Sequence, residues 1–193
     1  SGGKGGLARA VAARFSAAGW AVDAPSRAEL DVGDCSAVEE WFAGRPAYDL
    51  AVCAAGVTKD RPFLKQTEDE WDAVMGVNAR GAAWCARCAA AGMLREGREG
   101  QVVMIGSYAA YRPAPSQAAY AASKSALEGL VKSLAREWGK KGIRVNLVLP
   151  GFLLTDMTEG LRESVKEAAL SRHVLGRFNT PEQTAAFLLF LQE

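Results

Sequence analysis

The fold is indicated by three consecutive stretches: Gln101-Val-Val-Met-Ile-Gly106, the Ala-rich segment Gln117–Gly139, and Arg144-Val-Asn-Leu-Val-Leu149. The first and third are short, nearly continuous apolar runs, which is typical of strands buried on both faces. The segment between them has the apolar spacing of a helix. Two strands joined through a helix are expected to lie parallel in one sheet, with the helix covering a face.

The rest of the chain alternates in the same way. Further apolar runs occur at Trp20–Ala24 and Tyr48–Ala55, with a weaker one at Glu29–Val32. Helical spacing recurs at Gly6–Ala18, Ser36–Ala43, Glu68–Val74, Asn78–Glu96 and Pro181–Leu191. We therefore expect residues 1–193 to form a single α/β domain. Its predicted architecture is a three-layer, doubly wound (Rossmann-like) parallel sheet with helices on both faces.

Composition excludes several classes of partner. The 193 residues carry 23 Lys+Arg and 22 Asp+Glu, a formal net charge of +1, and 49% are hydrophobic. This balance gives no basic footprint for nucleic acid or for an anionic membrane. No apolar run approaches the roughly 18 residues of a membrane-spanning helix, and residues 1–12 lack the layout of a signal peptide. We expect neither nucleic acid nor a membrane as partner.

The four cysteines are Cys35, Cys53, Cys85 and Cys88. Cys85-Ala-Arg-Cys88 has the spacing of redox and zinc sites, but it falls inside an expected helix, and the single histidine, His173, is distant in sequence. We interpret the thiols as small buried residues of a reduced, cytoplasmic protein, and we expect no metal site.

The chain begins with a glycine-rich loop, Ser1-Gly-Gly-Lys4-Gly-Gly6-Leu7-Ala8. Glycines in such a loop let backbone amides approach a pyrophosphate at the N-terminus of a helix. The spacing differs from the common G-x-G-x-x-G pattern, and small residues also begin many tightly packed helices. The loop alone therefore leaves both interpretations open.

Ser26-Arg27 follows the second expected strand, where a doubly wound fold places the adenosine ribose. A hydroxyl and a guanidinium suit a 2′-phosphate, whereas an acidic residue there would repel one. Lys4 adds a positive charge nearby. An ordinary solvated arginine in a surface loop is the alternative. The hypothesis is that NADP(H) is preferred over NAD(H).

Tyr120-Ala-Ala-Ser-Lys124 places a phenol and an ammonium on one helix face, four residues apart. A cation beside a phenol stabilises the phenolate and brings its pKa towards neutral pH. Ser107 ends the strand at Gln101–Gly106, on the sheet edge where such folds bind ligands. The three residues are otherwise a surface Tyr, a solvated Lys and a turn Ser.

Over essentially its whole length the chain resembles the short-chain dehydrogenase/reductase family. Ser1–Ala8 resembles its T-G-x-x-x-G-I-G cofactor loop, with Ser for Thr and Ala for the last Gly. Asn78, Ser107, Tyr120 and Lys124 match the family's catalytic tetrad in type and order, and the last three also in spacing.

Three further segments are similar to family motifs. Leu30-Asp31-Val32 resembles the adenine-contacting Asp-Val, Cys53-Ala-Ala-Gly56 resembles the N-A-A-G turn, and Pro150-Gly-Phe-Leu-Leu-Thr155 resembles the P-G-x-x-x-T segment that holds the nicotinamide amide. With the loop residues above, the implied cofactor contacts are Ser1, Gly2, Lys4, Gly6, Leu7, Ser26, Arg27, Asp31, Val32, Ala54, Ala55, Gly56, Tyr120, Lys124, Pro150, Gly151, Leu153 and Thr155.

The resemblance implies hydride transfer between a nicotinamide and a substrate carbonyl. Tyr120 would donate the proton, Ser107 would orient the carbonyl, and Lys124 would lower the pKa of Tyr120 and bind the nicotinamide ribose. Asn78 is expected to hold a water in a proton relay. Cys53 replaces the family's usual Asn, which puts local stability or cofactor geometry in question but not the chemistry.

The later segments Asp156-Met-Thr-Glu159 and Leu175-Gly-Arg-Phe-Asn-Thr-Pro-Glu182 resemble those of the bacterial 3-oxoacyl-acyl-carrier-protein reductases. The implied substrate is a small carbonyl compound or acyl thioester of the 3-oxoacyl type. An acidic acyl-carrier protein would meet a basic rim of Arg162, Lys166, Arg172 and Arg177, although the interleaved glutamates also fit a solvated face. The alternatives are a sugar, steroid or secondary-alcohol dehydrogenase and a non-catalytic dinucleotide-binding regulator.

The resemblance also bears on assembly and completeness. Family members associate as homodimers or homotetramers through helices corresponding to Asn78–Glu96 and Gln117–Gly139. They have a strand before the glycine loop and another after the last helix, so we expect the 193 residues to lack the first and last strands. The interval between Trp20 and Asp31 is short, and Pro25–Ala28 is expected to replace the usual helix with a loop.

Overall fold

The computed structural model describes residues 1–192, which contain one three-stranded parallel sheet. Its strands are β1 (Leu50–Cys53), β2 (Gly100–Ile105) and β3 (Ile143–Val148), in the order β1-β2-β3. In this register Val52 lies opposite Val103. The expected parallel arrangement is confirmed.

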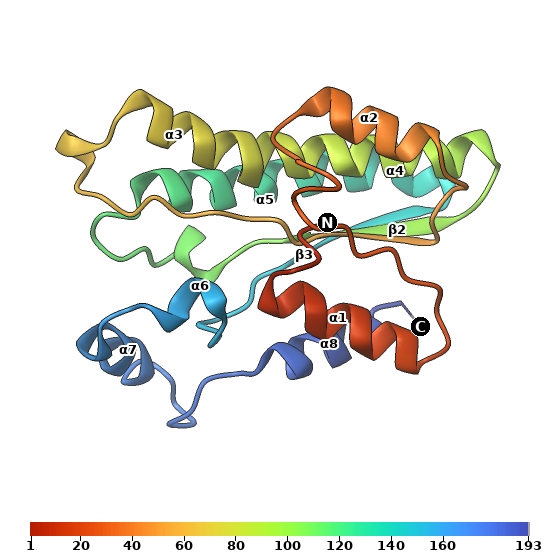
Figure 1. Ribbon diagram of the computed structural model, residues 1–193. Coiled ribbons are helices and arrows are strands. Elements are labelled where there is room, and N and C mark those ends of the chain that lie inside the picture. Colours follow the sequence, from red (N-terminus) through yellow and green to blue (C-terminus); the bar gives the residue numbers. More distant parts are fainter. Residues whose placement is uncertain (193) are drawn as a thin grey trace.

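Helices cover both faces of the sheet (Figure 1). On one side lie α2 (Cys35–Ala43), α3 (Glu68–Met75), α4 (Ala82–Arg95) and α5 (Ala118–Trp138). On the other lie α1 (Gly6–Ala17) and α8 (Pro181–Phe190), which pack together. After β3 come α6 (Asp156–Glu159) and α7 (Glu163–Leu170), and the short 3-10 or π segments are η1 (Phe63–Lys65), η2 (Gly76–Gly81), η3 (Tyr108–Ala110) and η4 (Gly139–Lys141).

Two apolar cores lie on the two sides of the central strand. Val102 and Met104 pack with Met93 of α4 in the first core, whereas Val103 packs with Phe15 of α1 in the second. Successive side chains of a strand point to opposite faces. Burial of both faces explains why Val102–Ile105 are all apolar rather than apolar at alternate positions.

Residue types at two element boundaries suit their positions. Thr180 caps α8, its hydroxyl accepting from the Gln183 backbone, with Pro181 in the first turn. Gly142 adopts a left-handed conformation (φ 78°) just before β3, which is favourable only for glycine among common residues. The stretch predicted as one helix over 78–96 differs in detail, because it starts inside the π segment Gly76–Gly81 and continues as α4.

Two predicted strands are absent from the described residues. Neither Trp20–Ala24 nor Glu29–Val32 pairs with a neighbouring strand, and both segments are irregular. The Glu29 and Leu30 amides instead donate to the Ser26 carbonyl, which closes a turn. Leu30 and Val32 are nevertheless buried. Their apolar character therefore reflects burial beneath the helices and not strand pairing, and the prediction of strands there was wrong.

Candidate active site

Two positions of the glycine loop have space only for glycine. Gly2 has a positive φ of 72°, and a Cβ on it would lie 2.9 Å from Ala55 Cα. A Cβ on Gly3 would lie 2.0 Å from the carbonyl oxygen of Ala24. The loop ends at the first turn of α1, where no side chain caps the backbone amides. Unpaired amides and the helix dipole suit a phosphate, so the loop fits the pyrophosphate of a dinucleotide.

The turn after β1 joins this loop to the centre of the site. The backbone nitrogen of Ser1 donates to the Val52 carbonyl (2.9 Å), and the Ala55 amide donates to Ser1 Oγ (3.4 Å). A Cβ on Gly56 would lie 3.5 Å from Asn78 Oδ1 and 3.6 Å from Lys124 Nζ. The turn of residues 54–56 therefore lies between the glycine loop and two of the predicted catalytic side chains.

Asn78 is fully buried and makes three hydrogen bonds from the π segment. Its Oδ1 accepts from the Val57 amide (2.8 Å), and its Nδ2 donates to the Val57 carbonyl (2.9 Å) and to Ser123 Oγ (3.0 Å). The side chain thus holds the chain that follows β1 against α5, which carries Tyr120 and Lys124.

Lys124 is also buried, with 4% of its surface exposed. Its ammonium donates to the Ile105 carbonyl at the end of β2 (2.7 Å) and lies 5.8 Å from the centre of the Tyr120 ring. Burial lowers the pKa of Lys124 from 10.5 to about 8, because the charged form loses hydration that one carbonyl replaces only in part.

Tyr120 lies beside Ser107, as the sequence predicts. Burial raises the pKa of the phenol above its usual range, and a hydrogen bond with the Ser107 side chain lowers it in part. Ser107 Oγ also accepts from the Ala109 amide (3.1 Å). The expectation that Lys124 lowers the pKa of Tyr120 is not met here, since the ammonium is directed at the Ile105 carbonyl.

On the predicted adenosine side, two carboxylates bind the residues predicted to hold the cofactor. The Ser26 amide and hydroxyl both donate to Glu29 Oε2, at 2.8 and 2.7 Å. Arg27 forms an ion pair with Asp31 Oδ2 (3.1 Å). The other Asp31 oxygen accepts from the Gly33 amide (2.9 Å), and this bond, more than Arg27, holds the pKa of Asp31 below its usual range.

Two residues on this side differ from the sequence-based prediction. Val32 has its side chain in the apolar core, so it presents only backbone towards a ligand. Glu29 was not among the predicted site residues. The only available signal was its spacing, an acid three residues after Ser26 in a loop too short for a helix.

The segment after β3 reaches the glycine loop. The Pro150 carbonyl accepts from the Tyr108 amide (3.1 Å), which ties it to the end of β2. A Cβ on Gly6 would lie 3.1 Å from Thr155 Cβ. The predicted nicotinamide-binding segment and the predicted pyrophosphate loop are therefore in contact, although 149 positions separate Gly6 from Thr155.

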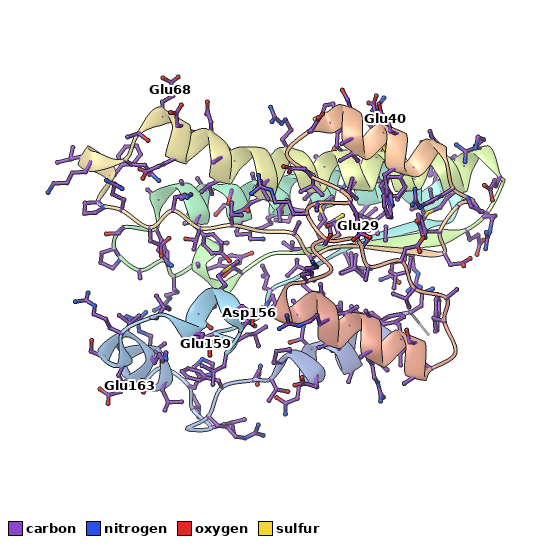
Figure 2. The ribbon with its side chains drawn as sticks, viewed as in Figure 1. Glu29, Glu40, Glu68, Asp156, Glu159 and Glu163 are labelled. Carbon is purple, nitrogen blue, oxygen red and sulfur yellow. The ribbon has the colours of Figure 1, made fainter. Side chains whose placement is uncertain are left out.

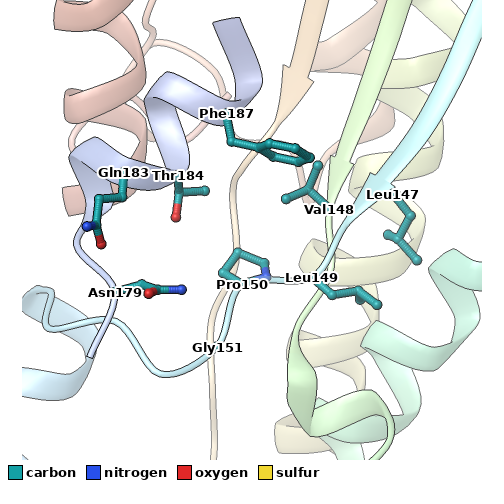
Figure 3. A pocket seen from close by; sticks show the side chains of 9 residues that line it. All are labelled: Leu147, Val148, Leu149, Pro150, Gly151, Asn179, Gln183, Thr184 and Phe187. Atoms are coloured by element: carbon teal, nitrogen blue, oxygen red, sulfur yellow. The ribbon is translucent and has the colours of Figure 1, made fainter. Parts of the chain in front are cut away.

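Two cavities flank this segment. One of about 440 Å³ lies between the end of β3 and α8 (Figure 3), and its lining includes Pro150 and Gly151. The other, of about 680 Å³, is lined in part by Gly6 and Thr155. Asn179 lines both cavities, and it was not among the site residues predicted from the sequence. Its backbone forms an isolated parallel β-bridge with Leu153. Neither cavity contains Tyr120.

All four cysteines are free thiols. The C-x-x-C pair lies within α4, with Cys85 in the core. Cys53, at the position of the family's Asn, is buried and donates from its Sγ to the Ala82 carbonyl (3.6 Å). The thiol thus provides a polar contact between β1 and the start of α4. No helix within residues 1–192 is long and apolar enough to cross a membrane.

The parallel sheet covered by helices on both faces and the glycine loop at the start of α1 are the arrangement of dinucleotide-binding α/β folds. A family model described as enoyl-(acyl carrier protein) reductase matches residues 7–193. The chain belongs to this family of short-chain dehydrogenases/reductases.

Individual relatives agree with this placement. The chain is 41% identical over 143 residues to a 3-oxoacyl-[acyl-carrier-protein] reductase FabG of Thermotoga maritima, covering 74% of this chain and 58% of that protein. It is 40% identical over 146 residues to an acetoacetyl-CoA reductase of Synechocystis, covering 76% of this chain and 60% of that protein. The chain thus spans about three fifths of the length of the curated relatives it matches.

A solved structure is also similar. A putative 2-deoxy-D-gluconate 3-dehydrogenase from Agrobacterium tumefaciens, with bound NADP, superposes with a TM-score of 0.89 at 30% identity. The match covers 98% of this chain and 85% of that one.

Proposed function

We propose that the protein is an NADP(H)-dependent carbonyl reductase that acts on 3-oxoacyl thioesters, with Tyr120 as the proton donor. The observation that carries this proposal is the convergence of Ser107, Tyr120 and a buried Lys124 at the carboxyl ends of parallel strands. The FabG and acetoacetyl-CoA reductase relatives support the substrate class.

Ser107 and Tyr120 have different roles in the proposed reaction. When bound, the nicotinamide supplies hydride to the carbonyl carbon. Ser107 donates a hydrogen bond to the carbonyl oxygen and orients it. Tyr120 then gives its proton to the oxygen as negative charge develops there. The phenol is protonated at neutral pH and so can act as the acid, and its raised pKa makes it a weaker acid than a phenol held beside a cation.

Lys124 and Asn78 take part in returning a proton to Tyr120 after it has given its own to the substrate. With a pKa of about 8, Lys124 exchanges protons readily near neutral pH. Asn78 Oδ1 accepts one hydrogen bond, from Val57, and an amide oxygen has a second lone pair available for a water. The closeness of both side chains to Gly56 supports a relay at this point.

The segment that follows β3 has exposed apolar side chains that suit an acyl chain. Leu154, Met157, Leu161 and Val165 follow β3 and are all more than a third exposed. Apolar side chains in such a segment suit the alkyl part of an acyl thioester. We propose acyl-carrier protein as the carrier, and a homodimer or homotetramer in the cytoplasm, a compartment that suits the free thiols.

NADP(H) is the proposed cofactor. The Ser26 hydroxyl, the Arg27 guanidinium and the Lys4 ammonium are the groups proposed for the 2′-phosphate. The NADP-bound neighbour supports the choice of cofactor. We expect tighter binding of NADPH than of NADH, and a loss of NADPH affinity in Arg27→Ala. Calorimetric titration of both cofactors checks this, and tighter NADH binding would contradict it.

The experiment for catalysis is the loss of reduced-nicotinamide absorbance with a panel of 3-oxoacyl thioesters, sugars, steroids and simple ketones. Tyr120→Phe should abolish turnover and leave NADPH affinity nearly intact. Tyr111→Phe is the matched control, because Tyr111 is exposed and its hydroxyl donates to Glu128. Appreciable turnover by Tyr120→Phe would refute the assignment.

The same panel tests the second candidate, a sugar, steroid or secondary-alcohol dehydrogenase. The similarity to a putative gluconate dehydrogenase structure is the observation in its favour. A non-catalytic dinucleotide-binding regulator is the third, and it would turn over no compound in the panel. The retained Ser107–Tyr120–Lys124 set argues against it.

A further inference from the structure

One carboxylate lies where the cofactor's 2′-phosphate is proposed to bind. Glu29 Oε2 accepts from both the amide and the hydroxyl of Ser26, at 2.8 and 2.7 Å. Ser26 is buried, whereas Glu29 is exposed. Figure 2 shows Glu29 in the segment that crosses the middle of the molecule.

The surroundings of this oxygen are those of an anion site. An N–H donor, an O–H donor and the positive charge of Lys4 act on the same carboxylate, and the Ser26 amide is the largest cause of its lowered pKa. A phosphate oxygen uses the same donors in the same way. Glu29 and a 2′-phosphate are therefore alternative ligands of Ser26.

The short loop explains why this contact exists. The Glu29 and Leu30 amides both donate to the Ser26 carbonyl (3.1 and 2.9 Å), so the backbone returns on itself within four residues. This turn brings the Glu29 side chain back to the residue that begins it. A longer helical excursion between Ser26 and Asp31 would carry residue 29 away.

We propose that Glu29 is an internal competitor for the 2′-phosphate and sets how strongly the protein distinguishes NADP(H) from NAD(H). A 2′-phosphate reaches the Ser26 donors only when the Glu29 carboxylate leaves them, and Arg27 must likewise leave Asp31. A cofactor with a 2′-hydroxyl brings no second anion to this point. The inference rests on the proposed NADP(H) site.

The test compares Glu29→Gln with the unaltered protein by calorimetric titration of two fragments, adenosine 2′,5′-bisphosphate and AMP. Neutralising Glu29 should tighten binding of the bisphosphate about tenfold, because a like charge is removed and the Ser26 donors are held less strongly. Affinity for AMP should change less than about twofold. This readout requires no turnover.

Glu40→Gln is the matched control. Glu40 lies on α2, is exposed, and has the same side chain and charge (Figure 2). It should change neither affinity by more than about twofold. A gain equal to that of Glu29→Gln would mean that net charge alone acts, and would overturn the proposal.

Ser26→Ala separates the contact from general electrostatics. In that background Glu29→Gln should improve bisphosphate binding by less than about tenfold, because the hydroxyl, one of the two shared donors, is gone and only the amide remains. An undiminished gain would overturn competition at Ser26.

The outcomes also separate this inference from the proposed cofactor preference. If the unaltered protein binds AMP more tightly than the bisphosphate, the NADP(H) preference fails, while a gain specific to Glu29→Gln still supports the competitor. If it prefers the bisphosphate and Glu29→Gln changes nothing, the preference stands and the competitor is rejected.

Discussion

Burial of Lys124 makes the stability of the fold depend on pH in a particular direction. Its folded-state pKa of about 8 lies below the unfolded value of 10.5. Between these two values the unfolded chain binds more protons than the folded one, so stability rises with pH. Below about pH 8 the full cost of burying the ammonium is present, and above about pH 10.5 it is gone.

The size of this effect follows from the shift. A difference of about 2.5 pKa units, at about 1.4 kcal/mol each, corresponds to about 3 kcal/mol in the free energy of unfolding. About 2 kcal/mol of it is regained between about pH 8 and pH 10. Most single substitutions change stability by less than the whole of this amount.

The measurement is urea unfolding at about four pH values from 7 to 10 for the unaltered protein and for Lys124→Met. Other titrating groups contribute almost equally to both, so the difference between the two curves isolates Lys124. It should change by about 2 kcal/mol in favour of the unaltered protein as pH rises. Lys132→Met, an exposed position on the same helix, should show no such gain. Parallel curves for Lys124→Met would refute the reasoning.

Three other substitutions test the framework of the site by urea unfolding. Gly3→Ala should lower the free energy of unfolding by about 3 kcal/mol and weaken dinucleotide binding, because the added Cβ would overlap the Ala24 carbonyl. An unchanged urea midpoint would show that the loop can move to make room for the Cβ. Asn78→Ala should cost about 2–4 kcal/mol, because it leaves the Val57 amide without its acceptor; a cost below about 1 kcal/mol would argue against this tie. Thr180→Ala should cost about 1 kcal/mol through loss of the α8 cap, and Thr180→Ser should retain most of it.

Periodicity in the sequence was sufficient for the layers of the fold. Continuous apolar runs predicted β1, β2 and β3, and helical spacing predicted α5 and α8. Periodicity failed at Trp20–Ala24, where Val22 is exposed, and at Glu29–Val32, where Leu30 and Val32 are buried without a partner strand. An apolar run favours burial of a segment, but it does not specify which backbone groups the segment pairs with.

The candidate site shows the same division. Residue types, their spacing and the family resemblance together selected Ser107, Tyr120 and Lys124, and the end of the strand before it placed Ser107 at the sheet edge where such folds bind ligands. Their partners depend on distances between segments far apart in sequence. The Lys124 ammonium donates to the Ile105 carbonyl rather than acting on the Tyr120 hydroxyl.

On the adenosine side, residue types alone indicated a hydroxyl and a guanidinium free for a phosphate. Folding gave both of them acceptors within the chain, Glu29 for Ser26 and Asp31 for Arg27. The motifs and the family resemblance thus indicated the class of protein and the candidate reactive groups. The closing of a short loop determined which of those groups are already bound to each other, because hydrogen bonds and ion pairs act only over a few ångströms in the folded chain.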